Sequence, residues 1–82
     1  MNLERAAMQG RLAEAEHDQT RLQLRIESAA KALCRGLNTA LIDDVRELEI
    51  PQLDEQFDVL KSAWGEYLSL DQKISRLQRE LK

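Results

Sequence analysis

The side chains with the most chemical potential are few in this sequence. His17 is the single histidine and Cys34 the single cysteine. A zinc site needs three or four ligands, which this pair does not supply. Glu14, Glu16 and Asp18 stand close together, and carboxylates of helical bundles hold metals when they point inward. Because the predicted helix turns these acids and His17 outward, the sequence predicts no catalytic, cofactor-binding or metal-binding residues. We expect a protein that is not an enzyme.

Cys34 is interpreted as a packed, inert residue. It falls at the predicted C-terminal end of a helix, where the helix dipole opposes thiolate formation. A single cysteine forms no intrachain disulfide, which is typical of a reducing cytosol. No run of apolar residues approaches the length of about 20 that a membrane-spanning helix needs, and no secretory signal is visible. The sequence therefore predicts a cytoplasmic protein without a membrane partner.

Two apolar seams define the elements that must position these residues. Members recur at alternating steps of three and four, which places them on one side of a helix and is typical of a coiled coil. The first seam contains Met8, Leu12, Ala15, Gln19, Leu22, Ile26, Ala29 and Leu33, and the second contains Leu53, Gln56, Leu60, Ala63, Tyr67, Leu70, Ile74, Leu77 and Leu81. The sequence predicts an all-α, antiparallel helical hairpin that forms a single domain over residues 1–82.

The helix boundaries are predicted from glycine and proline. Gly36 is expected to end the first helix (about 2–35), because glycine accepts the left-handed conformation after a helix. Pro51 is expected to open the second helix (about 51–81), since proline suits a first turn. The connection (36–50) is expected to hold a short helix capped by Asn38 or Thr39. Its apolar face, Leu41, Val45 and Leu48, would fold back onto Phe57 and Trp64 unless a second subunit covers them.

An antiparallel pairing of the seams predicts an approximate register. Gln19 would meet Tyr67 in one polar layer that fixes the register. The apolar layers would pair Leu33 with Leu53, Ile26 with Leu60, Leu12 with Ile74 and Met8 with Leu77. Because a lone two-helix hairpin buries little apolar area, we expect a homodimeric bundle. A monomer would need the connection to act as a third helix.

The aromatic residues Phe57, Trp64 and Tyr67 all fall within eleven residues of the second helix. One interpretation is a core cluster that packs under the connection. The other is an exposed surface for a protein partner, extended by Leu68 and Leu24, because tryptophan and tyrosine are typical interface anchors. Both interpretations remain open at the level of sequence.

Charge is distributed unevenly along the chain. The net charge is −3, and the middle segment (36–58) holds one basic residue, Arg46, against seven acidic ones. The first helix carries Arg11, Arg21, Arg25 and Lys31, and two such helices in a dimer could bind nucleic acid with one face. Interspersed acids and the net negative charge oppose clustered phosphate binding, so nucleic acid is the less favoured partner.

The stretch from residue 33 onward resembles small helical proteins of Mu-like transposable prophages. The matching string is Leu33-Cys34-Arg35-Gly36-Leu37-Asn38, then Ile50-Pro51-Gln52-Leu53-Asp54, then Leu60, Ala63, Trp64, Tyr67, Leu70, Ile74 and Leu77. The resemblance covers about the C-terminal 50 residues. It implies a helix end, a loop, a proline-started helix and a closing leucine zipper in a phage-derived protein of the bacterial cytosol, and it carries over no catalytic residues.

These observations predict a small protein–protein interaction module, an adaptor or inhibitor, that associates with itself. Two alternatives remain. One is a nucleic-acid-associated regulator of the ROP-like hairpin-dimer type, and the other is a purely structural oligomerisation element.

Overall fold

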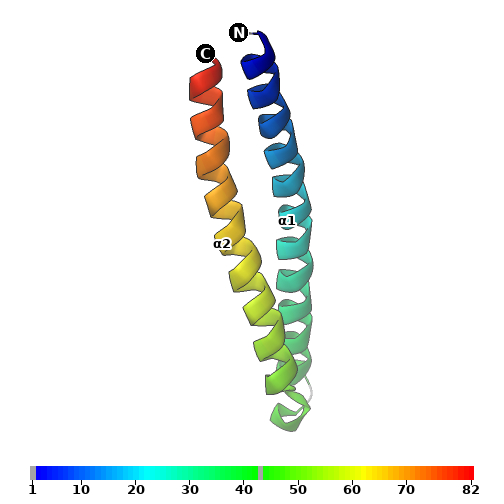
Figure 1. Ribbon diagram of the computed structural model, residues 1–82. Helices are drawn as coiled ribbons and strands as arrows, with labels where there is room; N and C mark the ends of the chain where they lie inside the picture. Colours follow the sequence, from blue (N-terminus) through cyan, green and yellow to red (C-terminus); the bar gives the residue numbers. More distant parts are fainter. Residues whose placement is uncertain (1, 43) are drawn as a thin grey trace.

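The computed structural model is an antiparallel hairpin of two long helices (Figure 1). Helix α1 (Asn2–Ile42) is followed by a 3-10 turn, η1 (Val45–Glu47), and by helix α2 (Ile50–Leu81). The structure describes residues 2–42 and 44–82, without the side chains of Asn2 and residues 39–42. Both termini lie at one end and η1 at the other, and the molecule measures 64 × 15 × 13 Å. The predicted all-α helical hairpin is confirmed.

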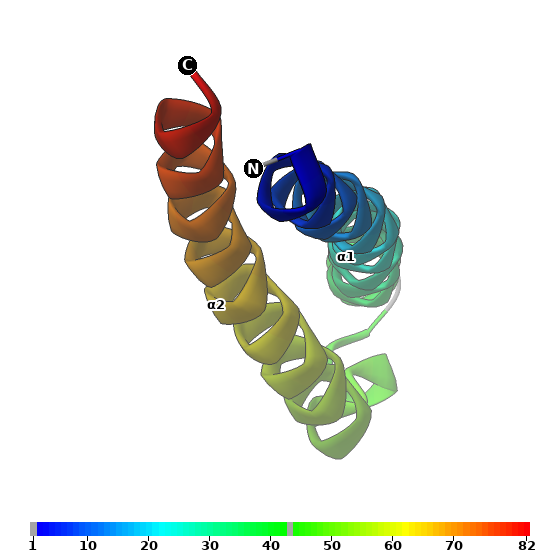
Figure 2. The same cartoon turned by 45° about the horizontal axis from the view of Figure 1, so that its top comes forward.

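The two seams face each other along the hairpin. Every residue of the first seam is buried or half-buried, and so is every residue of the second seam except Gln56. The most deeply buried apolar residues are Ala15, Ala29, Ala63, Ile74 and Leu77. The other leucines of both seams are only half-buried, because each helix has a single neighbour. Figure 2 shows α1 covering one side of α2, with no other described element on the opposite side.

The observed register differs from the predicted one. Gly36, three residues beyond Leu33, lies against Leu53, and an ideal Cβ at Gly36 would stand 2.6 Å from Leu53 Cδ2. Counted in steps of seven from this contact, Ala29 would lie opposite Leu60 and Ala15 opposite Ile74. Small residues would then face large ones, an arrangement that fits the deep burial of both alanines. The predicted layers of two large residues would hold the helices further apart.

Gln19 shows the same shift at the middle of the hairpin. Its Nε2 donates to Asp71 Oδ1 at 3.2 Å, one turn beyond the predicted partner Tyr67, and this bond is exposed. At the open end, Arg5 Nη2 donates to the carbonyl oxygen of Leu81 at 3.0 Å. Gln19 therefore forms a polar contact across the seam, as predicted, with Asp71 as its hydrogen-bond partner.

The end of α1 was placed too early by the sequence. The helix continues through Gly36 to Ile42, and no described glycine has a positive φ. A glycine inside a helix costs only about 1 kcal/mol relative to alanine. Here the missing side chain makes room for Leu53, so packing against α2 offsets that cost. Asn38 and Thr39 consequently lie within α1 instead of capping a separate helix.

The connection is shorter than predicted and contains one 3-10 turn. Asp44 caps this turn, because its Oδ1 accepts from the Arg46 backbone N–H at 2.9 Å and its Oδ2 lies 2.7 Å from Arg46 Nη2. The turn contacts α1 rather than folding along α2, and the side chain of Leu41 lies outside the described residues. Helix α2 begins at Ile50 with Pro51 in its first turn, as predicted.

Candidate protein interaction surface

An apolar surface runs along α2 beside the second seam, from the end of the helix that follows η1 to just past its middle. It consists of Ile50, Phe57, Trp64 and Leu68, and we call it the aromatic stripe. Their exposed fractions are 60%, 48%, 57% and 41%. Ile50, Phe57 and Trp64 are spaced by seven residues, and Leu68 follows one turn later, so all four share one side of the helix.

The stripe widens the apolar side of α2. Each of its first three members stands three residues before a seam residue, namely Leu53, Leu60 and Tyr67. An apolar face of this width is typical of a helix that packs against two neighbours in a bundle, whereas a two-stranded coiled coil needs the narrow seam alone. In this hairpin α2 has one long neighbour, α1, which contacts the seam and leaves the stripe open.

A shallow hollow lies in the middle of the stripe, lined by Phe57, Leu60, Lys61 and Trp64. The Lys61 ammonium stands 5.3 Å from the centre of the Phe57 ring and 3.3 Å from Asp58 Oδ1. A lysine over an aromatic ring makes a cation–π contact that favours this side-chain arrangement. The hollow therefore has two aromatic walls and one charged border.

The structure distinguishes the two interpretations of the aromatic residues. Phe57, Trp64 and Leu68 are exposed on one side of α2, while Tyr67 is half-buried in the second seam. The core interpretation is wrong because the short turn η1 ends the hairpin without folding along α2. Ile50 belongs to the stripe but was missed, although its spacing of seven from Phe57 is visible in the sequence. Leu24 is exposed on the side of α1 opposite its seam and lies apart from the stripe.

The residues with potential for catalysis or metal binding stay apart. His17 is exposed, as expected, and Cys34 is exposed too, so the prediction of a packed thiol is wrong. Glu14 and His17 have the Glu-x-x-His spacing of bundle metal sites, which the sequence prediction left out. Both side chains point to solvent, and no group of three or more candidate ligands occurs among the described residues.

The basic residues of α1 do not form an isolated positive surface. Arg21 Nη2 lies 3.2 Å from Asp18 Oδ1, and Glu14, Glu16 and Glu27 are exposed on the same helix. Among the described residues, no helix has the length and apolar character needed to cross a membrane.

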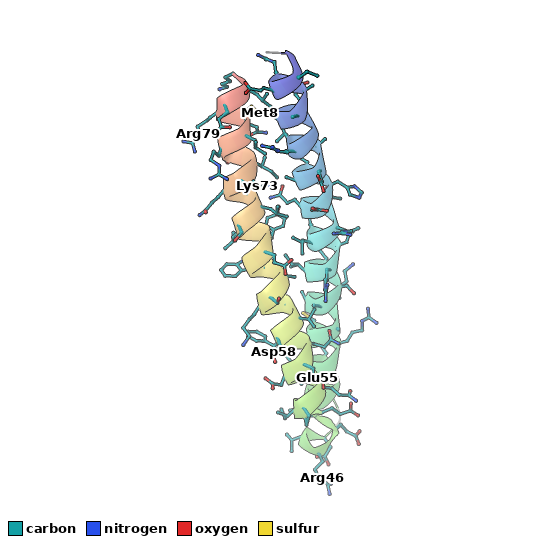
Figure 3. The ribbon with its side chains drawn as sticks, in the orientation of Figure 1. Met8, Arg46, Glu55, Asp58, Lys73 and Arg79 are labelled. Carbon is teal, nitrogen blue, oxygen red and sulfur yellow. The ribbon has the colours of Figure 1, made fainter. Side chains whose placement is uncertain are left out.

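Charge on α2 changes sign from one end to the other. Figure 3 shows Glu55 and Asp58 near the end of α2 that follows η1, and Arg79 near its C-terminal end. Asp54 adds to the acidic residues at the N-terminal end of α2, and Arg76 and Lys82 add to the basic residues at its C-terminal end. The helix therefore has an acidic N-terminal end and a basic C-terminal end.

Comparisons of the chain with models of protein families, with curated proteins and with solved structures found no match. The resemblance to proteins of Mu-like prophages therefore stays a prediction, and the surface described above carries the functional argument.

Proposed function

We propose that this protein is a small, non-enzymatic interaction module, an adaptor or inhibitor, whose aromatic stripe binds a helix of another polypeptide chain. The observation that carries the proposal is the exposure of Trp64 and Phe57 on a regular helix. A phage-derived protein acting in the bacterial cytosol is part of the proposal, and it rests on the resemblance given above.

The energetics of the stripe support binding. Burial of apolar surface gains roughly 25 cal/mol per Å², and a large aromatic side chain offers 150–250 Å². Trp64 and Phe57 therefore hold much of the binding free energy that the stripe can supply. Because both stand on a helix, only their side-chain torsions need to be fixed on binding, which keeps the entropic cost low.

The shape of the stripe supports a helical partner. Its members recur at steps of seven and four along one side of α2. The apolar face of another helix packs against residues at this spacing. Lys61, Asp58 and Asp54 border the stripe, so charged groups would restrict which partners fit.

The experiment is site-specific photo-cross-linking in the cells that produce the protein. A benzoylphenylalanine is placed at Trp64 in one variant and at His17, on the exposed side of α1, in the control. We expect adducts of discrete mass from position 64 and none from position 17. Equal labelling at both positions, or no adduct at position 64 in a folded protein, would contradict the proposal.

A further inference from the structure

We infer that the chain that covers the aromatic stripe is a second copy of this protein, bound in an antiparallel, two-fold dimer along α2. The inference rests on the proposed function, because it names the occupant of the same surface. Three independent observations support it: the area left exposed, the pairing of residues along the stripe, and the reversal of charge along α2.

The exposed area of the hairpin is too large for a compact protein of its mass. The accessible surface is 6668 Å² for a chain of 9.5 kDa. A compact monomer of this mass exposes about 5,000 Å². The excess, roughly 1,600 Å² per chain, leaves ample area for a standard interface, which takes about 800 Å² from each partner.

The stripe is self-complementary when two α2 helices run antiparallel with full overlap. The two-fold axis then crosses the stripe at the level of residue 66, near the midpoint of α2. In this register Trp64 of each copy packs on Leu68 of the other, and Phe57 lies opposite the small Ser75. Lys61 lies opposite Asp71, which gives two ion pairs related by the axis. Every large member of the stripe except the terminal Ile50 meets an uncharged residue.

Other registers bring like charges or unfavourable partners together. A slide of seven residues toward the N-terminal ends of α2 places Asp54 opposite Asp71 of the second copy, and the opposite slide places Leu68 opposite Asp71. A slide of fourteen places Trp64 opposite the charged Asp54 and leaves about two-fifths of each helix unpaired. A parallel arrangement sets Lys61 beside Lys61 and Asp54 beside Asp54. Like charges that face each other across an interface are unfavourable, and so is a charge buried against an apolar side chain without a partner, so the sequence disfavours these alternatives.

The end charges favour the same orientation. An antiparallel dimer brings the acidic N-terminal end of α2 beside the basic C-terminal end of α2 in the second copy (Figure 3). The acidic residues are Asp54, Glu55 and Asp58, and the basic residues are Arg76 and Arg79. Opposite charges at both ends of the interface steer the two chains into antiparallel register. α1 does not obstruct this contact, because it packs on the seam side of α2 (Figure 2).

A charge-reversal series tests the pairing of Lys61 with Asp71. The variants are Lys61→Asp, Asp71→Lys and the double variant, and dimer dissociation is followed by analytical ultracentrifugation. Each single change should raise Kd about tenfold, because it creates two like-charge contacts per dimer. The double change should return Kd close to the wild-type value.

Contacts within one chain do not imitate this rescue. Lys61 pairs with Asp58, and Asp71 accepts from Gln19. The double variant loses both contacts, so a purely intrachain role would leave it at least as weak as the single variants. Failure of the double variant to recover would overturn the proposed register.

Distances between spin labels test the orientation independently. Cys34 is first replaced by serine because it is exposed, and single labels are then placed at Ser69 and at Glu55. In the antiparallel dimer the axial separation is about 9 Å at position 69 and about 33 Å at position 55, at about 1.5 Å per residue. Similar distances at the two positions would indicate a parallel dimer and overturn the orientation.

The experiments distinguish failure of the proposed dimer from failure of the proposed function. A folded monomer at all concentrations, with a position-64 adduct to a different protein, would overturn the dimer and leave the proposed function standing. A folded monomer without any adduct at position 64 would overturn both.

Discussion

At the scale of single residues, Gly36 shows how one residue type serves two purposes. Glycine commonly ends helices, and the sequence favoured that role. In the structure its backbone is helical, and its missing side chain admits Leu53 to the surface of α1. Sequence alone does not separate these roles, because the deciding atom belongs to a residue on the other helix.

Substitution of the glycines measures this contact. Nothing stands within 4 Å of a Cβ at Gly65, whereas a Cβ at Gly36 meets Leu53 Cδ2. Gly65→Ala should stabilise the fold by about 0.5–1 kcal/mol through helix propensity. Gly36→Ala should be about 1 kcal/mol less favourable than that, because Leu53 must shift. Urea unfolding checks both, and equal gains would show that the close approach has no energetic weight.

The stability of the turn η1 is expected to depend on pH through Asp44. The side chain of Arg46, and then its backbone N–H, hold the pKa of Asp44 below its ordinary value of 3.8. The charged form is thus favoured in the folded protein. Its contribution to stability is complete above about pH 3.8 and is lost as the pH falls through the lowered pKa.

Replacement of Arg46 by alanine tests the cause of this shift. The pKa of Asp44 should rise toward 3.8 in the variant without reaching it, because the backbone N–H still donates. Carboxyl NMR titration of both proteins provides the measurement. An unchanged pKa for Asp44 would show that the Arg46 side chain does not cause the shift.

At the scale of elements, the hydrophobic spacing predicted both helices and the side of each helix that packs against the other. Pro51 predicted the start of α2 to within one residue. The length of α1 and the register were not predictable from this spacing. A repeat of three and four fixes which side of a helix is apolar, but it does not fix which layer of the partner each residue meets. That choice depends on the sizes of Ala15, Ala29 and Gly36 against large residues of α2.

Gln19 tests what fixes the register between the elements. It is half-buried in the first seam, and its bond to Asp71 is exposed. Gln19→Leu should stabilise the hairpin by about 1 kcal/mol, since added apolar burial exceeds the loss of one exposed hydrogen bond. The melting temperature should then rise by a few degrees.

The same substitution should also reduce the specificity of assembly. Without a polar contact across the seam, more than one oligomeric state should be detected by light scattering. Loss of folding in Gln19→Leu would contradict this account of the position.

At the scale of the whole molecule, the hairpin is extended. Its radius of gyration is 18.5 Å, against about 12 Å for a compact domain of this length. The sequence suggested the aromatic residues but could not decide whether they were covered. Their exposure depends on where η1 packs, which is set by the extension of α1 and the cap at Asp44. A chain of this shape gains stability when a second helix pair covers the aromatic stripe.

Trp64 provides the most direct test of that claim, because it is the single tryptophan of the chain and lies at the centre of the stripe. Its fluorescence emission is measured over about a hundredfold range of protein concentration, since mass action populates the dimer as concentration rises. We expect a shift to shorter wavelength with increasing concentration, and in Lys61→Asp the same shift should occur at higher concentration. Emission typical of a water-exposed tryptophan throughout the range would contradict the claim that a second copy covers the stripe.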